Sequence, residues 1–169
     1  MSYETSRLSV DEITSDLSAA QLSRLLAAIP HILTADVVKN LPPYFHGITT
    51  EAEALLWFKR MMEESRLWMV TDSKQGHPIG FIFAFVEHTT AHIGYLLKQS
   101  HWGKGLASEL LKAFINEVTH TGWRVLIGGV DRSNIASAKL LLKLGFVERI
   151  AQKDSGVVFY EYWLVEPTQ

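Results

Sequence analysis

The 169-residue chain contains no cysteine. This absence excludes disulfides, a cysteine nucleophile and cysteine-based metal sites, and it leaves no protein thiol on which an acyl group could be carried. The sequence also lacks an N-terminal apolar leader and any apolar run of about eighteen residues, which are the marks of a secretory signal and a transmembrane helix. We therefore expect an intracellular, cytoplasmic protein with no membrane partner and no metal.

Charge of either sign is scarce as well. Asp, Glu, Lys and Arg make up 20% of the residues, and the formal net charge is -2. Proteins that bind nucleic acid carry a basic face, so no nucleic-acid partner is expected. Hydrophobic residues amount to 47%, which is enough for a sizeable core. The length suits one domain, which we expect to span residues 1–169.

The most informative stretch joins an apolar segment, a glycine-rich turn and an amphipathic helix. Residues 93–97 are predicted to form a strand, and Gly103-Lys104-Gly105 forms the turn. Apolar residues then recur at helical spacing, at Leu106, Leu110, Leu111, Phe114 and Val118. A second apolar strand is predicted at 125–130, and it completes a βαβ unit.

The turn before this helix predicts an anion site. Unpaired backbone N–H groups point outward at the start of a helix, and Gly103 and Gly105 carry no Cβ that would block an incoming group. Lys104 adds a positive charge, so a phosphate or pyrophosphate is the simplest ligand. The spacing matches neither the Rossmann G-x-G-x-x-G motif nor a P-loop, and an ordinary turn before a helix remains the alternative.

Two motifs together resemble a known family. Trp-Gly-Lys-Gly-Leu-Ala at 102–107 precedes one helix, and Asn-Ile-Ala-Ser at 134–137 leads to Lys-Leu-Gly-Phe at 143–146. Both are similar to motifs of the GNAT superfamily of N-acetyltransferases, and most similar to its RimJ/RimL-like branch, the ribosomal-protein-alanine N-acetyltransferases. Many GNAT proteins carry Arg or Gln at the position of Trp102, whereas this branch commonly carries an aromatic residue. The resemblance is specific over 79–146 and looser over 5–70.

The other predicted elements are compatible with this family. From the N-terminus they are a strand at 7–10, a helix from Ser18 to Pro30, a helix behind a capping box at 50–53, strands at 67–71 and 79–86, a helix from Asn134 through Leu144 with Gly145 as its C′ residue, and a hairpin of 146–151 and 157–165 turned at 154–156. Together they predict a three-layer α/β/α sandwich with a mixed, mostly antiparallel sheet. The resemblance further implies that the central parallel strands splay apart and admit acetyl-CoA.

The resemblance implies acetyl-CoA as the cosubstrate and suggests which residues hold it. Backbone N–H groups of 103–107 would bind the pyrophosphate, and the backbone of 96–97 would pair with the pantetheine arm and the thioester oxygen. The expected contacts are Leu96, Leu97, Trp102, Gly103, Lys104, Gly105, Leu106, Ala107, Ser108 and Asn134. Two alternatives stay open, because Leu96 and Leu97 could be plain strand core and Asn134 a plain N-cap.

The catalytic residues are less well defined. Many GNAT proteins place a tyrosine seven positions after the matching asparagine, but this chain has Leu141 there. The resemblance therefore implies Ser137 as the proton donor to the departing thiolate, and an ordinary serine at a helix start is the alternative. Glu87 and His92 are the candidates for the general base, and each could instead be a surface residue. A metal site formed by His88 and His92 is disfavoured, because the two histidines flank the hairpin predicted at 87–90 and do not lie on a helix.

The expected acceptor is a primary amine, either a protein N-terminal α-amine or a small-molecule amine. Its pocket is expected from the loop at 41–47, the following helix with Trp57, and the closing hairpin with Tyr160 and Tyr162. Direct transfer in a ternary complex is expected, and the family often forms homodimers. Two other functions stay open: a catalytically silent acyl-CoA-binding module, and a toxin that acetylates aminoacyl-tRNA, for which Lys139, Lys143, Arg149 and Lys153 form only a thin basic patch.

Overall fold

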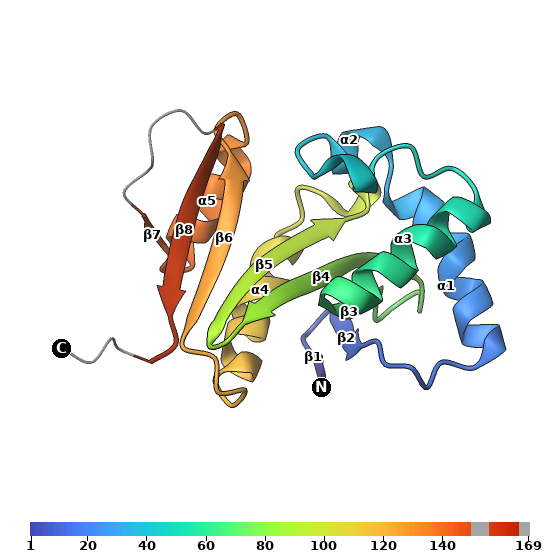
Figure 1. Cartoon of the computed structure of the whole chain (residues 1–169), viewed down its shortest axis with the longest axis horizontal. Coiled ribbons are helices and arrows are strands. Elements are labelled where there is room, and N and C mark those ends of the chain that lie inside the picture. The colour runs from blue at the N-terminus through green and yellow to red at the C-terminus, as the bar shows by residue number, and fades with distance from the viewer. Residues whose placement is uncertain (150–155, 166–169) are drawn as a thin grey trace. The chain divides into compact units, whose positions relative to one another are not determined.

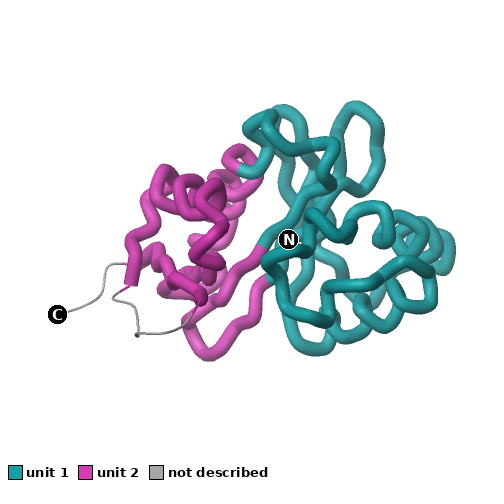
Figure 2. Tube along the Cα trace, turned by 90° about the horizontal axis from the view of Figure 1, so that it is seen from above, with its two compact units in different colours: residues 1–83, 95–107 teal, residues 84–94, 108–169 magenta. Residues whose placement is uncertain are grey.

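The computed structural model describes residues 1–149 and 156–165 (Figure 1). Its strands form one eight-stranded sheet with the order β1-β2-β3-β4-β5-β6-β8-β7. The chain divides into two compact units (Figure 2): Met1–Phe83 with Tyr95–Ala107, and Ala84–Gly94 with Ser108–Gln169. Two strands, β4 (Pro78–Glu87) and β5 (Thr90–Leu97), contribute residues to both units.

The first unit contains three antiparallel strands at the start of the sheet. β1 (Ser2–Glu4) pairs with β2 (Leu8–Glu12), and β2 pairs with β3 (Arg66–Asp72). Alternation buries Leu8 and Val10 on one face of β2. The sequence predicted β2 and β3 but not β1, whose three residues are too few for a periodic signal.

Two long helices of the first unit pack on each other, and one of them packs on β3. α1 (Ala19–Ile32) begins at the capping box of Ser18 and Gln21, and α3 (Glu51–Glu64) begins at that of Thr50 and Glu53. Both N-termini are therefore confirmed. The short elements α2 (Ala35–Val38), η1 (Pro43–Phe45) and η2 (Gln99–His101) complete this unit. The core residues of the two long helices are Leu25, Ile29, Ile32, Ala54, Trp57, Phe58 and Met61.

The prediction that Pro30 ends α1 is wrong, because the helix continues to Ile32. A proline inside a helix removes one backbone hydrogen bond and crowds the carbonyl four residues earlier. Pro30 lies in the last turn, where little helix remains to be disrupted. Leu33 then closes the helix by donating its N–H to the Ile29 carbonyl at 2.9 Å.

The second unit contains the parallel pair and the end of the sheet. β6 (Val125–Asp131) pairs parallel with β5 from Thr90↔Val125 to Ile93↔Gly128, and antiparallel with β8 (Val157–Trp163). β7 (Val147–Glu148) pairs antiparallel with β8. The mixed, mostly antiparallel sheet is thus confirmed, as is the closing hairpin. Residues 150, 151, 154 and 155 of that predicted hairpin lie outside the described residues.

Two helices flank these strands in the sequence. α4 (Leu106–Val118) follows the glycine turn, and α5 (Ile135–Lys143) packs on β6 and β7. Gly145 has φ +101°, the left-handed conformation expected of a C′ residue. Within the described ranges, none of the helices is long and apolar enough to cross a bilayer.

Candidate functional site

The glycine turn connects η2 to α4 and is exposed. Gly103 and Gly105 have φ values of +72° and +75°, a conformation that residues with a Cβ rarely adopt. Apart from its chain neighbours, no atom of the described residues lies within 4 Å of the place that a Cβ on Gly103 would occupy. The glycines therefore serve the backbone conformation, and the space beside Gly103 is open to a ligand.

Arg7 reaches this turn from the segment before β2. Its Nη1 donates a hydrogen bond to the carbonyl oxygen of Lys104 at 2.9 Å. Its Nη2 would lie 3.7 Å from a Cβ placed on Gly105. The positive end of α4 thus has two cationic side chains. Lys104 is part of the turn, and Arg7 is hydrogen-bonded to it. The sequence analysis missed Arg7, because no local pattern connects residues 97 positions apart.

The end of β5 is fixed from both sides. The Trp102 indole Nε1 donates to the Leu97 carbonyl at 2.9 Å, and the Lys98 N–H donates to the Ile79 carbonyl at 2.6 Å. A Cβ on Gly80 would be in hard contact with the Leu96 carbonyl oxygen, so only glycine permits this close approach of β4. The Leu96 and Leu97 side chains are buried, which agrees with the alternative that they belong to the core of the sheet. The role of their backbone in binding a cofactor stays a prediction.

His101 anchors the segment before the turn. Its Nε2 lies 3.2 Å from Asp72 Oδ2, and its Nδ1 lies 2.9 Å from Ser100 Oγ. Hydrogen bonds hold the pKa of the Asp72 carboxyl below its usual range, first that from the Lys74 backbone N–H and then that from His101. The ring of His101 therefore has a structural task, which is to attach η2 to the end of β3.

Asn134 and Ser137 lie together at the start of α5. The Asn134 side-chain oxygen accepts a hydrogen bond from the Ser137 backbone N–H at 3.3 Å. The N-cap role of Asn134 is therefore confirmed, whereas its contact with a cofactor stays a prediction. Ser137 is half-buried, and its role as proton donor also stays a prediction.

The candidate bases lie in the second unit. Glu87 is the last residue of β4, and His92 belongs to β5; both are exposed. Between the two strands, His88 has φ +56°, so the hairpin turn is tight. No group of three His, Asp or Glu side chains in the described part of the chain could hold a metal ion.

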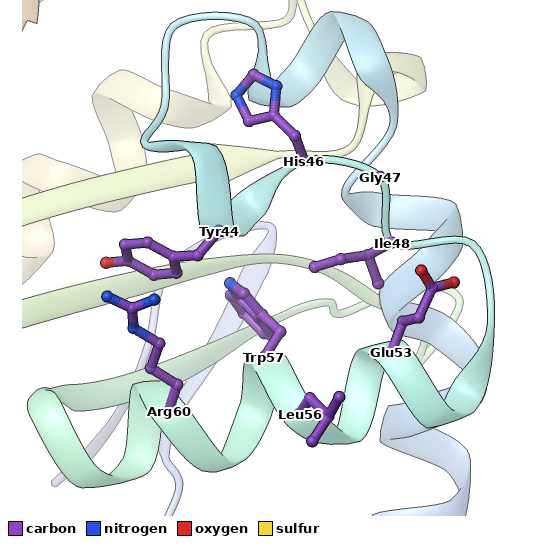
Figure 3. Close-up of a pocket in the computed structure, with 8 residues that line it drawn as sticks. All are labelled: Tyr44, His46, Gly47, Ile48, Glu53, Leu56, Trp57 and Arg60. Carbon is purple, nitrogen blue, oxygen red and sulfur yellow. The ribbon is translucent and has the colours of Figure 1, made fainter.

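A pocket lies between η1 and the first turns of α3, within the first unit (Figure 3). Its volume is about 270 Å³, and its lining residues are Tyr44, His46, Gly47, Ile48, Glu53, Leu56, Trp57 and Arg60. The structure thus brings together the loop at 41–47 and Trp57, as predicted for an acceptor pocket. Tyr160 and Tyr162 belong to β8 in the other unit and are not among these lining residues.

Comparison with protein families explains the two motifs. A family model described as an acetyltransferase (GNAT) domain matches residues 17–147. The chain belongs to the GNAT acetyltransferase family. The match includes the pocket, the glycine turn and the start of α5, whereas Arg7 lies before the matched residues and β8 after them.

Two curated GNAT relatives match part of the chain. The L-methionine sulfoximine/L-methionine sulfone acetyltransferase of Salmonella typhimurium is 35% identical over 72 residues, which cover 43% of this chain and 42% of that protein. The L-amino acid N-acyltransferase MnaT of Escherichia coli is 36% identical over 72 residues, covering 43% of this chain and 41% of that protein. Each match spans less than half of the relative's length.

Solved structures share the fold over nearly the whole chain. A GNAT-family acetyltransferase from Bacillus anthracis has a TM-score of 0.75 at 17% identity, covering 97% of this chain and 99% of that one. The ribosomal-protein-S5-alanine acetyltransferase from Vibrio fischeri has a TM-score of 0.71 at 17% identity, covering 98% of each chain. At this identity the likeness shows the fold, and the RimJ/RimL-like branch stays a prediction.

Proposed function

We propose that this GNAT chain is an acetyl-CoA-dependent N-acetyltransferase that acts on a primary amine, by direct transfer in a ternary complex. The observation that carries the proposal is the exposed turn of Gly103 and Gly105. Its backbone is held in the left-handed conformation at the N-terminus of α4, with the cations of Arg7 and Lys104 beside it. Backbone N–H groups and positive charge at a helix start suit the pyrophosphate of coenzyme A.

We assign the remaining contacts with acetyl-CoA to residues outside the turn. Ser108, in the first turn of α4, offers a hydroxyl to the phosphates, and Asn134 offers its amide. Leu96 and Leu97 lie beyond the last β5–β6 pair, Ile93↔Gly128. We assign the amides of the pantetheine arm to the backbone groups of this segment that neither Trp102 nor β4 occupies. Bound there, acetyl-CoA supplies an acetyl group activated as a thioester.

Two side chains of the protein would take part in proton transfer, one as acceptor and one as donor. The amine loses one as its nitrogen bonds to the acetyl carbon, and the sulfur gains one as the C–S bond breaks. We assign the first proton to Glu87, at the exposed end of β4, and the second to the Ser137 hydroxyl at the start of α5. Neither proton transfer needs a strong base or acid, because an α-amine has a pKa of about 8 and a thiolate, whose thiol has a pKa of about 8.5, leaves readily.

We place the chain in the RimJ/RimL-like branch because of its Trp102 motif and the serine at 137. The acceptor is then a protein N-terminal α-amine or a small-molecule amine. The silent acyl-CoA-binding module is less favoured, because both curated relatives are named as acetyl- or acyltransferases.

Titration calorimetry with acetyl-CoA tests the proposal on a matched pair of variants. Gly103→Glu puts a negative charge into the turn, and we expect it to weaken acetyl-CoA binding by at least a hundredfold. Gly122→Glu is the control, because Gly122 also has a positive φ, of +85°, and nothing within 4 Å of its Cβ position. An unchanged Kd in Gly103→Glu would overturn the phosphate site.

A further inference from the structure

The pocket between η1 and α3 contains an unused hydrogen-bond donor. Trp57 is 3% exposed, and its indole Nε1 is buried without a partner among the residues that the structure describes. An indole N–H only donates, and leaving a buried donor unsatisfied costs about 1–3 kcal/mol. Trp57 lines the pocket, and Figure 3 shows its nitrogen at the end of the ring farthest from α3, toward η1.

Aromatic packing fixes the direction of this donor. The Trp57 ring makes edge-to-face contacts with Phe45, at 5.7 Å between centroids, and with Phe81, at 5.3 Å. Phe45 in turn packs on Phe83 and Tyr44. A ring held on two sides cannot change the direction of its N–H without disturbing this cluster. The donor is therefore held on the η1 side of the ring (Figure 3).

The charges of the pocket are separated. The Arg60 guanidinium lies 3.7 Å from the centroid of the Tyr44 ring, and its Nε donates to Glu64 at 3.2 Å. In Figure 3, Tyr44, Arg60 and the indole nitrogen lie at one end and Glu53 at the other. The Glu53 carboxylate already accepts hydrogen bonds from Thr49 and Thr50, first among them that of the Thr50 hydroxyl, which hold its pKa below the usual range.

Two apolar side chains also line the pocket, those of Ile48 and Leu56. Leu56 is 71% exposed, so its apolar atoms are open to a ligand. His46 contributes little donor capacity, because its Nε2 already lies 2.8 Å from the Leu41 carbonyl oxygen. A fitting ligand has an oxygen for the Trp57 N–H and the Arg60 end, and apolar atoms for Ile48 and Leu56.

We infer that this pocket receives the α-carbonyl oxygen of an amino-acid unit with an apolar side chain, either free or at the N-terminus of a peptide. The inference rests on the proposed acetyl transfer, for which it names the acceptor class. Polyamines do not fit, because a protonated polyamine has only donors. It could not accept a hydrogen bond from the Trp57 N–H.

A set of matched amines tests the inference by kcat/KM with acetyl-CoA saturating. The values are expressed per concentration of neutral amine, because an α-amine has a pKa of about 8 and an alkylamine one of about 10.4. L-leucine, leucinamide and a leucyl peptide share a side chain with 3-methylbutylamine, which lacks the carbonyl group. We expect one of the first three to exceed 3-methylbutylamine and spermidine at least tenfold, which is the worth of one hydrogen bond to a buried donor. The compound with the highest kcat/KM among these three shows whether the acceptor is a free amino acid or a peptide.

Trp57→Phe removes the donor and keeps an aromatic ring. We expect it to bring the ratio of the best leucine compound to 3-methylbutylamine close to one, without changing the KM for acetyl-CoA. Trp68→Phe is the control, because Trp68 is also buried but does not line the pocket. If Trp57→Phe kept the ratio while the enzyme still acetylated amines, the pocket inference would be overturned and the proposed function would stand.

An NMR measurement reads the donor directly and does not depend on turnover. The chain has five tryptophans, so the ¹⁵N-labelled protein gives few indole N–H signals. The Trp57 signal is assigned by its loss in Trp57→Phe, and we expect it to shift on addition of the best leucine compound but not of 3-methylbutylamine. An unmoved Trp57 signal contradicts the inference, and a protein that binds no acetyl-CoA overturns both proposals.

Discussion

Arg7 connects the N-terminal segment to the glycine turn through the Lys104 carbonyl. The residue is exposed, so the hydrogen bond is worth about 1 kcal/mol, but it holds the turn that we propose binds pyrophosphate. We therefore expect Arg7→Ala to raise the KM for acetyl-CoA about fivefold and to leave kcat nearly unchanged.

Steady-state kinetics with matched variants check this prediction. Arg24→Ala removes an equally exposed arginine from α1 and should leave the KM for acetyl-CoA unchanged. Arg7→Lys keeps the charge but not the planar fork, so it should restore part of the affinity. Equal KM values in Arg7→Ala and the unmodified enzyme would remove Arg7 from the site.

Ser137 offers a second test at a single position. Its backbone N–H serves the Asn134 cap, so Ser137→Ala keeps the start of α5 intact and removes only the hydroxyl. We expect kcat to fall severalfold and the KM values to change little, because the thiolate leaves readily even without an acid. Ser137→Thr retains a hydroxyl and should recover much of the rate. An unchanged kcat in Ser137→Ala would mean that Ser137 is not the proton donor.

The contact between β4 and β5 depends on one glycine. A Cβ on Gly80 would press on the Leu96 carbonyl and would lie 2.8 Å from Leu97 Cδ2. We expect Gly80→Ala to lower the free energy of unfolding by about 2 kcal/mol, as measured by urea denaturation. In Gly128→Ala the new Cβ would meet only the end of the Leu141 side chain, at 3.1 Å, so its loss should be smaller. Equal losses of unfolding free energy in the two variants would show that the close contact with the Leu96 backbone is not what makes Gly80 necessary.

An ion pair joins β2 and β3. Arg66 donates to Glu12 through Nε at 2.7 Å and Nη2 at 2.8 Å, and this hydrogen bonding is the main cause that lowers the pKa of Glu12. A lowered carboxyl pKa stabilises the fold above the ordinary value of 4.5, and this stabilisation is lost as the pH falls through the pKa of the folded state.

Glu12→Gln should therefore destabilise the protein at pH 7, on the order of 1 kcal/mol, and much less at pH 3. Urea denaturation at the two pH values measures the difference. Glu64→Gln breaks the exposed pair with Arg60, whose side chains are about half exposed, and should have almost no effect at either pH. A pH-independent effect of Glu12→Gln would contradict the assignment.

Local sequence signals predicted most of these elements. The capping boxes at Thr50 and Ser18 mark helix starts by themselves, and the left-handed Gly145 marks a helix end. The extension of α1 past Pro30 escaped prediction, because a proline in the last turn of a helix disrupts far less than one in its middle, and the sequence alone did not show where that turn lies. β1 and η1 escaped as well, since each has three residues and exists through its packing.

At the scale of the whole molecule, the family followed from two motifs, because the glycine turn needs residues without a Cβ and the start of α5 needs an N-cap residue. The functional contacts between residues far apart in the sequence could not be predicted from these motifs. Arg7 meets the glycine turn, and the ring of Trp57 is set by Phe45 and Phe81, through tertiary packing that no local pattern encodes. The predicted acceptor pocket included the loop at 41–47 and Trp57, which contribute to the pocket between η1 and α3, and the β8 tyrosines, which are not among its lining residues. The unpaired donor of Trp57 became visible only in the structure.

The central claim is that the Gly103–Gly105 turn binds acetyl-CoA for transfer to an amine. Titration calorimetry of the unmodified protein with acetyl-CoA, followed by mass spectrometry of leucine and leucyl peptides incubated with both, tests it most directly. The account predicts micromolar binding and an added acetyl group on the α-amine. Absence of binding would mean that the turn only starts a helix, and it would contradict the proposed function together with the acceptor class.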